Sequence, residues 1–97
     1  MLTLAASAEV PSDAGTFLLA DAYGAQRCIY VKDRDLGVPT IDADQLRDRG
    51  DSPVDPLVLD LMGTAKHVRE IQVVNGLSRG ALSDAVAGKP AGTLISA

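Results

Sequence analysis

Hydrophobic and polar positions along the chain predict helices and strands in alternation. The run 14–23 is apolar almost all round a helix, follows a possible cap at Ser12 and Asp13, and is stopped by Gly24. A helix that is apolar on every side is a buried helix, so we expect this one inside the molecule. The run 27–32 has β-branched and aromatic residues without helical spacing, which predicts a strand.

The middle of the chain predicts two further helices. The polar segment 42–49 ends at Gly50 and is expected to form two turns of surface helix. Asp55 and Pro56 are typical of a helix cap and of the first helical position. The apolar positions that follow at spacings of four, four and three predict an amphipathic helix. They are Leu57, Leu61, Ala65 and Val68.

The last part of the chain predicts a strand, a turn, a helix and a final strand. The strand is expected over 70–74 and the last strand over 92–96. Between them, Asn75 and Gly76 begin a turn, and a helix running to Ala87 is stopped by Gly88.

This alternation predicts the fold class. Strands joined through helices favour parallel pairing, because a parallel partner requires a long crossover connection. We therefore expect an α/β fold with a small, mostly parallel sheet of three strands and flanking helices. Residues 1–10 are expected to form a loose N-terminal segment, and residues 11–97 one compact unit.

The composition also predicts a shallow hydrophobic core. The 97 residues suffice for one domain, and 46% hydrophobic with 23% charged residues is a globular balance. Only 3% are aromatic, and small side chains gain less from burial than the roughly 1.5–3 kcal/mol of a buried Leu or Phe. We therefore expect the chain to bury additional apolar surface against a partner protein.

Charge and targeting signals exclude several classes of partner. Nine basic and 13 acidic residues give a net charge of −4, and the basic ones are scattered, which argues against nucleic acid. Residues 1–10 lack a basic region and are too short to span a bilayer, so we expect no membrane association. A single cysteine, Cys28, favours a reducing compartment, the cytoplasm.

Three places carry candidate chemistry, each with a structural alternative. Asp13 at a helix start could organise an anion, a metal or a lysine, but the cap is the favoured interpretation. Lys32 and Asp35 follow a strand, where ligands of open α/β sheets sit, although such charge runs are usually solvated turns. Asn75 and Gly76 could hold a ligand against a strand end or form only a tight turn, which we favour.

Two other reactive side chains point to no site of their own. His67 has no second histidine or cysteine nearby, so a metal role is not expected. Cys28 lies in an apolar strand without a histidine to activate it, which favours a core position. The chain has no glycine-rich phosphate loop of either common form.

These features together resemble a known family. The Ser-Asp pair at 12–13 with its apolar helix, and the closing pattern of Asn-Gly, GALSDAVAG and GTLI over 75–95, resemble the C-terminal part of the amino-acid kinase superfamily, which includes the uridylate kinases. The segments 12–33 and 65–77 are more similar to molybdenum storage protein subunits, relatives of the uridylate kinases. The resemblance covers 11–97.

The resemblance implies a function and a site. In this superfamily ATP, with Mg²⁺, binds over the strand ends of the C-terminal half; in the storage branch ATP hydrolysis is linked to packing molybdate or tungstate inside a hexameric cage. Asp13 matches the aspartate at the phosphoryl-transfer centre, so we expect it to be the catalytic residue. Lys32 and Asp35 fall in the loop that contacts ATP, and with Asn75 they are the expected cofactor-binding residues.

The sequence also departs from the family pattern. It begins just before the Ser-Asp motif, so the half that carries the phosphate loop is not expected in it, and residues 36–39 replace the family's adenine-enclosing loop. We therefore expect a truncated or split storage-type chain that contributes part of an ATP site and subunit contacts, is inactive alone, and associates with a full-length homologous subunit or with itself. One alternative is a non-catalytic oligomerisation module that uses the helix 57–68 and edge strands. Another is a uridylate kinase-like phosphotransferase.

Overall fold

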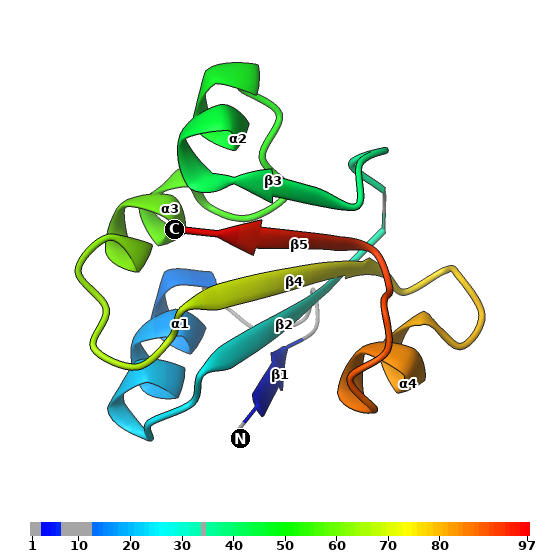
Figure 1. Ribbon diagram of the computed structural model, residues 1–97, viewed down its shortest axis with the longest axis horizontal. Helices are drawn as coiled ribbons and strands as arrows, with labels where there is room; N and C mark the ends of the chain where they lie inside the picture. The colour runs from blue at the N-terminus through cyan, green and yellow to red at the C-terminus, as the bar shows by residue number, and fades with distance from the viewer. Residues whose placement is uncertain (1–2, 7–12, 34) are drawn as a thin grey trace.

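A computed structural model describes residues 3–6, 13–33 and 35–97, and it contains one five-stranded sheet with helices on both faces (Figure 1). The strands are ordered β1-β2-β4-β5-β3 across the sheet. Their bounds are β1 (Thr3–Ala6), β2 (Arg27–Lys32), β3 (Thr40–Asp42), β4 (Glu70–Asn75) and β5 (Thr93–Ser96). The helices are α1 (Asp13–Ala22), α2 (Ala43–Arg49), α3 (Pro56–Met62) and α4 (Ala81–Val86).

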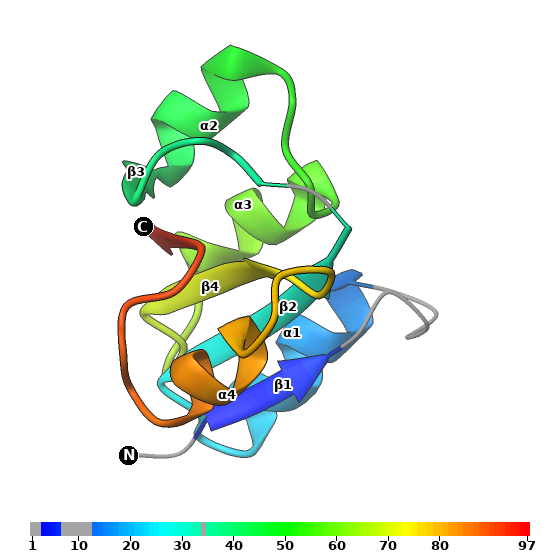
Figure 2. The ribbon, with the colours of Figure 1, turned by 90° about the vertical axis from the view of Figure 1, so that its right-hand side faces the viewer.

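The sheet confirms the predicted α/β class. Strand pairs β1–β2, β2–β4 and β3–β5 are parallel, and β4–β5 is antiparallel. Figure 2 shows α4 on one face of the sheet and α1 and α3 on the other. Among the described residues, none of the helices has the length and apolar character needed to span a bilayer.

The prediction of three strands is wrong, because β1 and β3 are also present. β1 falls within the N-terminal segment to which no element was assigned, and it forms by pairing with β2, with Thr3 opposite Arg27. β3 has three residues and pairs with β5, with Ile41 opposite Ile95. Strands of three or four residues form because they pair with a neighbouring strand. The periodicity of their own residues therefore gives little indication of them.

The central strands β2 and β4 build both halves of the core. Cys28 and Tyr30 face the α1 side together with their neighbours on β4, and this cluster holds most of the buried side chains. Ile29 and Val74 point the other way and pack with Ala85 of α4. Alternation of side chains across a strand places the two sets on opposite faces.

The helix α1 is buried on one side only, which corrects the prediction of a fully buried helix. Phe17 and Ala20 are each 1% exposed, whereas Leu18 and Leu19 on the other side are 54% and 51% exposed. Its predicted cap residue Ser12 lies outside the described residues. Among the described residues, the sheet covers one side of α1 and α3 packs next to it, whereas the side that carries Leu18 and Leu19 is exposed to solvent.

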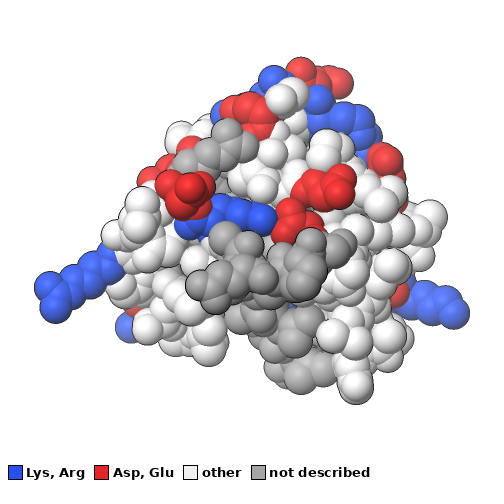
Figure 3. Space-filling model, turned by 180° about the vertical axis from the view of Figure 1, so that it is seen from behind, with Lys and Arg blue, Asp and Glu red and all other residues white. Residues whose placement is uncertain are grey.

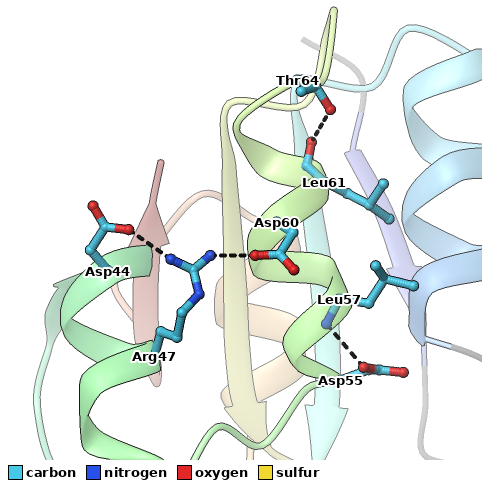
Figure 4. Close-up of polar contacts among 7 residues, drawn as sticks. All are labelled: Asp44, Arg47, Asp55, Leu57, Asp60, Leu61 and Thr64. Atoms are coloured by element: carbon cyan, nitrogen blue, oxygen red, sulfur yellow. Dashed lines mark hydrogen bonds and ion pairs between the residues drawn. The ribbon is translucent and has the colours of Figure 1, made fainter.

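The helix α2 confirms the predicted surface helix. The side chain of Asp42 accepts the N–H of Gln45 at 2.7 Å, and the side chain of Gln45 accepts the N–H of Asp42 at 3.2 Å, a reciprocal capping box. Gly50 ends the helix in the left-handed conformation, with φ +73°. Arg47 then joins α2 to α3 by binding Asp44 at 2.8 Å and Asp60 at 2.7 Å (Figure 4).

The helix α3 is shorter than predicted and presents a different face to the core. It ends at Met62, before Gly63, and does not reach Val68. Leu57, taken as part of the apolar stripe, is 50% exposed. The buried face consists of Val58, Leu59 and Met62.

The chain after α3 is held by Asp21 of α1 instead of continuing the helix. One carboxylate oxygen of Asp21 accepts the N–H groups of His67 at 2.7 Å and Val68 at 3.0 Å, and the other accepts the N–H of Lys66 at 3.2 Å. A loop that offers three N–H groups to one carboxylate competes with the helical hydrogen bonds. His67 therefore lies in this loop and not in a helix.

Gly92 is expected to be indispensable for the sheet. It adopts φ +61°, and a Cβ atom there would overlap the main-chain oxygen of Val73. We predict that Gly92→Ala lowers the free energy of unfolding by more than about 4 kcal/mol, as backbone overlap and strain combine. Gly88→Ala is the control: Gly88 has φ +82° but open space around it, so it should cost only about 1–2 kcal/mol. Equal losses in urea unfolding would contradict the close approach.

Asp21 is expected to make the free energy of unfolding depend on pH in the acidic range. The Val68 N–H, with those of His67 and Lys66, lowers the pKa of Asp21 below its usual value. Its contribution is therefore complete above the unfolded pKa of about 3.9 and is lost as pH falls through the folded pKa. Urea midpoints of Asp21→Asn and the parent chain should differ most near neutral pH and converge in acid. Asp48→Asn, at an exposed position on α2, should show no such convergence.

Candidate functional site

The structure brings the four predicted site residues to one edge of the sheet. β2 and β4 are parallel neighbours, and their last residues, Lys32 and Asn75, are register partners. Asp13 begins α1 and reaches Lys32, and Asp35 in the loop after β2 reaches Asn75. This is the carboxyl edge of the parallel strands, where open α/β sheets bind ligands.

Asp13 is the most connected side chain of this edge. One carboxylate oxygen lies 2.9 Å from the Nζ atom of Lys32, and both side chains are only 16% exposed. The other oxygen accepts the main-chain N–H of Asp55 at 3.0 Å. The carboxylate thus ties the start of α1 to the end of β2 and to the segment that begins α3.

Tyr30 contacts both members of this pair. Its hydroxyl donates to the main-chain oxygen of Asp13 at 2.7 Å, and its ring centre lies 5.8 Å from the Nζ atom of Lys32. Burial raises the pKa of Tyr30 well above its usual value, with Cys28 and Asp13 adding to the rise. The phenol therefore remains a protonated donor at any physiological pH.

Cys28, on the same side of β2, is a core residue as predicted. It is fully buried, and burial raises the pKa of its thiol to about 11. A thiol with that pKa carries almost no thiolate at neutral pH, so it is a poor nucleophile.

Asn75 forms the tight turn that its sequence position predicted, and its side chain also contacts Asp35. Its side-chain oxygen accepts the N–H of Leu77 at 2.9 Å, which makes the predicted turn. Its side-chain nitrogen donates to Asp35 at 3.2 Å. The N–H of Gly76 donates to the main-chain oxygen of Lys32 at 2.7 Å, and a Cβ at Gly76 would lie 2.6 Å from a methyl carbon of Val31. The turn therefore packs directly on the end of β2.

A shallow groove begins beside Asp35. It has a volume of about 450 Å³ and opens broadly to solvent. Asp35 is its charged member, and the rest of its lining comes from the loop before β3 and the start of β5, namely Gly37, Val38, Pro39, Gly92 and Thr93. A second hollow of about 320 Å³ includes Arg27, Gln72 and Lys89, which belong to the opposite half of the strands or to the segment after α4.

The charges of the site are mixed. Lys32 is the basic side chain that the described residues bring to Asp13, and the carboxylate of Asp35 lies beside Asn75. Within the described ranges, no cluster of three or more histidine, cysteine or acidic side chains could hold a metal ion. On the face seen in Figure 3, charged side chains of both signs gather over α2 at the top, and the described residues form no extended basic surface there.

Two residues of the site were not predicted from the sequence. Asp55 was interpreted only as a helix cap, a role it has through its side chain, which accepts the N–H of Leu57 at 3.0 Å. Its contact with Asp13 uses the main-chain N–H, which every residue except proline possesses, so no residue type signals it. Tyr30 was interpreted as a strand residue, and its hydroxyl in an otherwise apolar stretch was the available sign of a buried hydrogen bond.

The chain is similar in sequence to a curated protein and in structure to solved kinase-fold proteins. No protein-family model matches it. Its sequence is 43% identical over 101 residues to the molybdenum storage protein subunit beta of Azotobacter vinelandii, a match that covers 89% of this chain and 37% of the relative. The chain therefore spans little more than a third of the length of that relative.

Solved structures match the fold. The UMP kinase of Ureaplasma parvum superposes with a TM-score of 0.72 at 16% identity, over 88% of this chain and 39% of the kinase. The N-acetylglutamate synthase of Neisseria gonorrhoeae, solved with coenzyme A and L-arginine, superposes with a TM-score of 0.60 at 16% identity, over 84% of this chain and 22% of the synthase. These matches confirm the amino-acid kinase fold, and the sequence match confirms the resemblance to a storage subunit.

The Asp13–Lys32 pair should show strong energetic coupling. Removal of one partner leaves a largely buried charge without its counterion, which is costly. We predict that the single changes Asp13→Asn and Lys32→Met together cost about 1–3 kcal/mol more than the double variant does. A double-mutant cycle in urea unfolding measures this coupling. Coupling below about 0.3 kcal/mol would mean that the pair does not hold the edge together.

Proposed function

We propose that this chain, a relative of the molybdenum storage protein subunits with the fold of the amino-acid kinase superfamily, contributes one side of a binding site for ATP and its magnesium ion. The observation that carries the proposal is the Asp13–Lys32 pair at the carboxyl ends of parallel strands. The neighbouring Asn75–Asp35 pair extends the same edge.

The residues of the edge suit the phosphates of a nucleotide in part. The ammonium group of Lys32 has three N–H donors, and among the described residues it donates one of them to Asp13, so further donors could bind phosphate oxygens. The groove beside Asp35 offers space for the rest of a nucleotide next to the same edge. Its lining of Gly37, Val38 and Pro39 is largely apolar, as binding sites for bases commonly are.

The carboxylates of the edge suit magnesium as the partner of the phosphates. Magnesium in proteins is commonly held by one or two carboxylates together with substrate phosphates. Asp13 and Asp35 would supply those oxygens. Bound magnesium would offset the repulsion between these carboxylates and the phosphates.

This edge alone lacks what phosphoryl transfer needs. Proteins that transfer phosphoryl groups act by positioning the phosphates and by neutralising their charge. The described residues bring the single ammonium group of Lys32 here, and Asp13 already engages it. We therefore infer that the chain binds nucleotide weakly and has no kinase or ATPase turnover without a partner that supplies further positive charge.

The storage role belongs to the same proposal. The relative is named as a subunit of a molybdenum storage protein, and we extend that role to this chain. Its cargo would be molybdate or tungstate, and its partner a longer related subunit or a second copy in a hexamer-type assembly.

Nucleotide binding can be tested through Lys32. We predict that isothermal titration with ATP and Mg²⁺ gives saturable binding that Lys32→Met weakens at least about tenfold, a loss of about 1.4 kcal/mol. Lys66→Met, a change of an exposed lysine far along the chain from this edge, is the matched control and should bind as the parent does. Circular dichroism verifies that each variant is folded.

Two results would contradict the proposal. Equal affinity of Lys32→Met and the parent chain for ATP and Mg²⁺ would show that Lys32 does not contact the nucleotide. Magnesium-dependent phosphate release by the chain alone, abolished by Asp13→Asn, would show that this edge is a complete catalytic site.

A further inference from the structure

The outward side of α1 is apolar along its length, yet the described chain leaves it uncovered. Leu18 and Leu19 are 54% and 51% exposed, and Tyr23, just after the helix, is 73% exposed. In Figure 3 the surface over α1, at the lower right, is largely free of charged side chains. A helix with apolar residues on every side is normally covered on every side.

The neighbouring helix α3 extends this surface. α1 and α3 pack against each other, and Leu57 of α3 is 50% exposed. Figure 4 shows Leu57 on the side of α3 that is nearer α1. We call the surface formed by Leu18, Leu19, Tyr23 and Leu57 the α1 patch.

The two ends of the α1 patch carry opposite charge. At the N-terminal end of α1, the main chain of Asp55 binds Asp13, and Asp55 itself is exposed. At the C-terminal end, the loop held by Asp21 brings the exposed residues Lys66 and Arg69. The patch is thus apolar in the middle. Asp55 leaves a net negative charge at the end where Lys32 neutralises Asp13, and Lys66 and Arg69 outweigh the carboxylate of Asp21 at the other.

We propose that the α1 patch binds the same patch of a second copy of this chain across a two-fold axis. A two-fold contact joins a surface to itself, so the surface must be self-complementary. With the two α1 helices antiparallel, the acidic end at Asp55 of each copy meets the basic end at Lys66 and Arg69 of the other. Antiparallel helices also bring opposite ends of their dipoles together.

The patch is small, which sets the expected strength of the contact. α1 has ten residues and is therefore about 15 Å long. With a helix diameter of about 10 Å, a surface of that length covers far less than the roughly 800 Å² per partner of a stable interface, so association should depend on concentration. The contact leaves the side chains of Lys32, Asp35 and Asn75 outside the α1 patch, so association can be measured in the absence of nucleotide.

Sedimentation velocity over a concentration series tests this proposal. We expect the parent chain to shift from monomer to dimer between roughly 10 µM and 1 mM, the range typical of small interfaces. Leu18→Glu and Leu19→Glu should each weaken the dimer at least tenfold, because a buried carboxylate would lie on the axis. Lys66→Glu should weaken it several-fold by placing like charges opposite each other.

The matched control is Val86→Glu on α4, on the other face of the sheet. Val86 is 62% exposed, similar to the two leucines, and its change should leave the dimer intact. A chain that stays monomeric to 1 mM would overturn the proposal. It would equally be overturned by a dimer that survives Leu18→Glu and Leu19→Glu, or by association only with a longer related subunit.

Discussion

The carboxylate of Asp13 is the contact on which the arrangement of this edge depends. It joins three segments that are far apart in the sequence: the start of α1, the end of β2 through Lys32, and the residue before α3 through the N–H of Asp55. Tyr30 adds a bond from β2 to the main chain of Asp13. Because the ion pair is largely buried, its two charges depend on each other, and the same contact that fixes the edge also holds the ammonium group of Lys32 at the carboxyl ends of the strands.

The elements that could be predicted are those determined by the residue pattern within the element itself. β2 has the predicted bounds because its β-branched and aromatic residues favour a strand, and α2 lies between a polar cap and Gly50 as predicted. α3 differs because three N–H groups of the following loop bind Asp21, 45 to 47 positions away. β3 likewise depends on pairing with β5. Contacts at that separation leave no periodicity in the sequence.

The position of the candidate site could be predicted from the sequence, but the contacts between its residues could not. Strand ends indicated Lys32 and Asn75, since parallel strands finish at one edge. The start of a helix indicated Asp13, the loop after a strand indicated Asp35, and the resemblance to the kinase family then assigned roles to all four. What the sequence could not indicate is that these residues bond to one another, or that a main-chain N–H of Asp55 completes the Asp13 contact. At Asp13, which a local pattern presents as a helix cap, the structure shows a carboxylate that binds Lys32 and the N–H of Asp55, both distant in the sequence.

One measurement tests the central claim directly. In a chain labelled with ¹³C and ¹⁵N, NMR can follow the side-chain nitrogen of Lys32 and the carboxyl carbon of Asp13 during titration with ATP and Mg²⁺. The account predicts that both signals shift together and saturate with one dissociation constant. Saturable binding that leaves both unchanged and moves the signals of Arg27 and Lys89, in the second hollow, would contradict it.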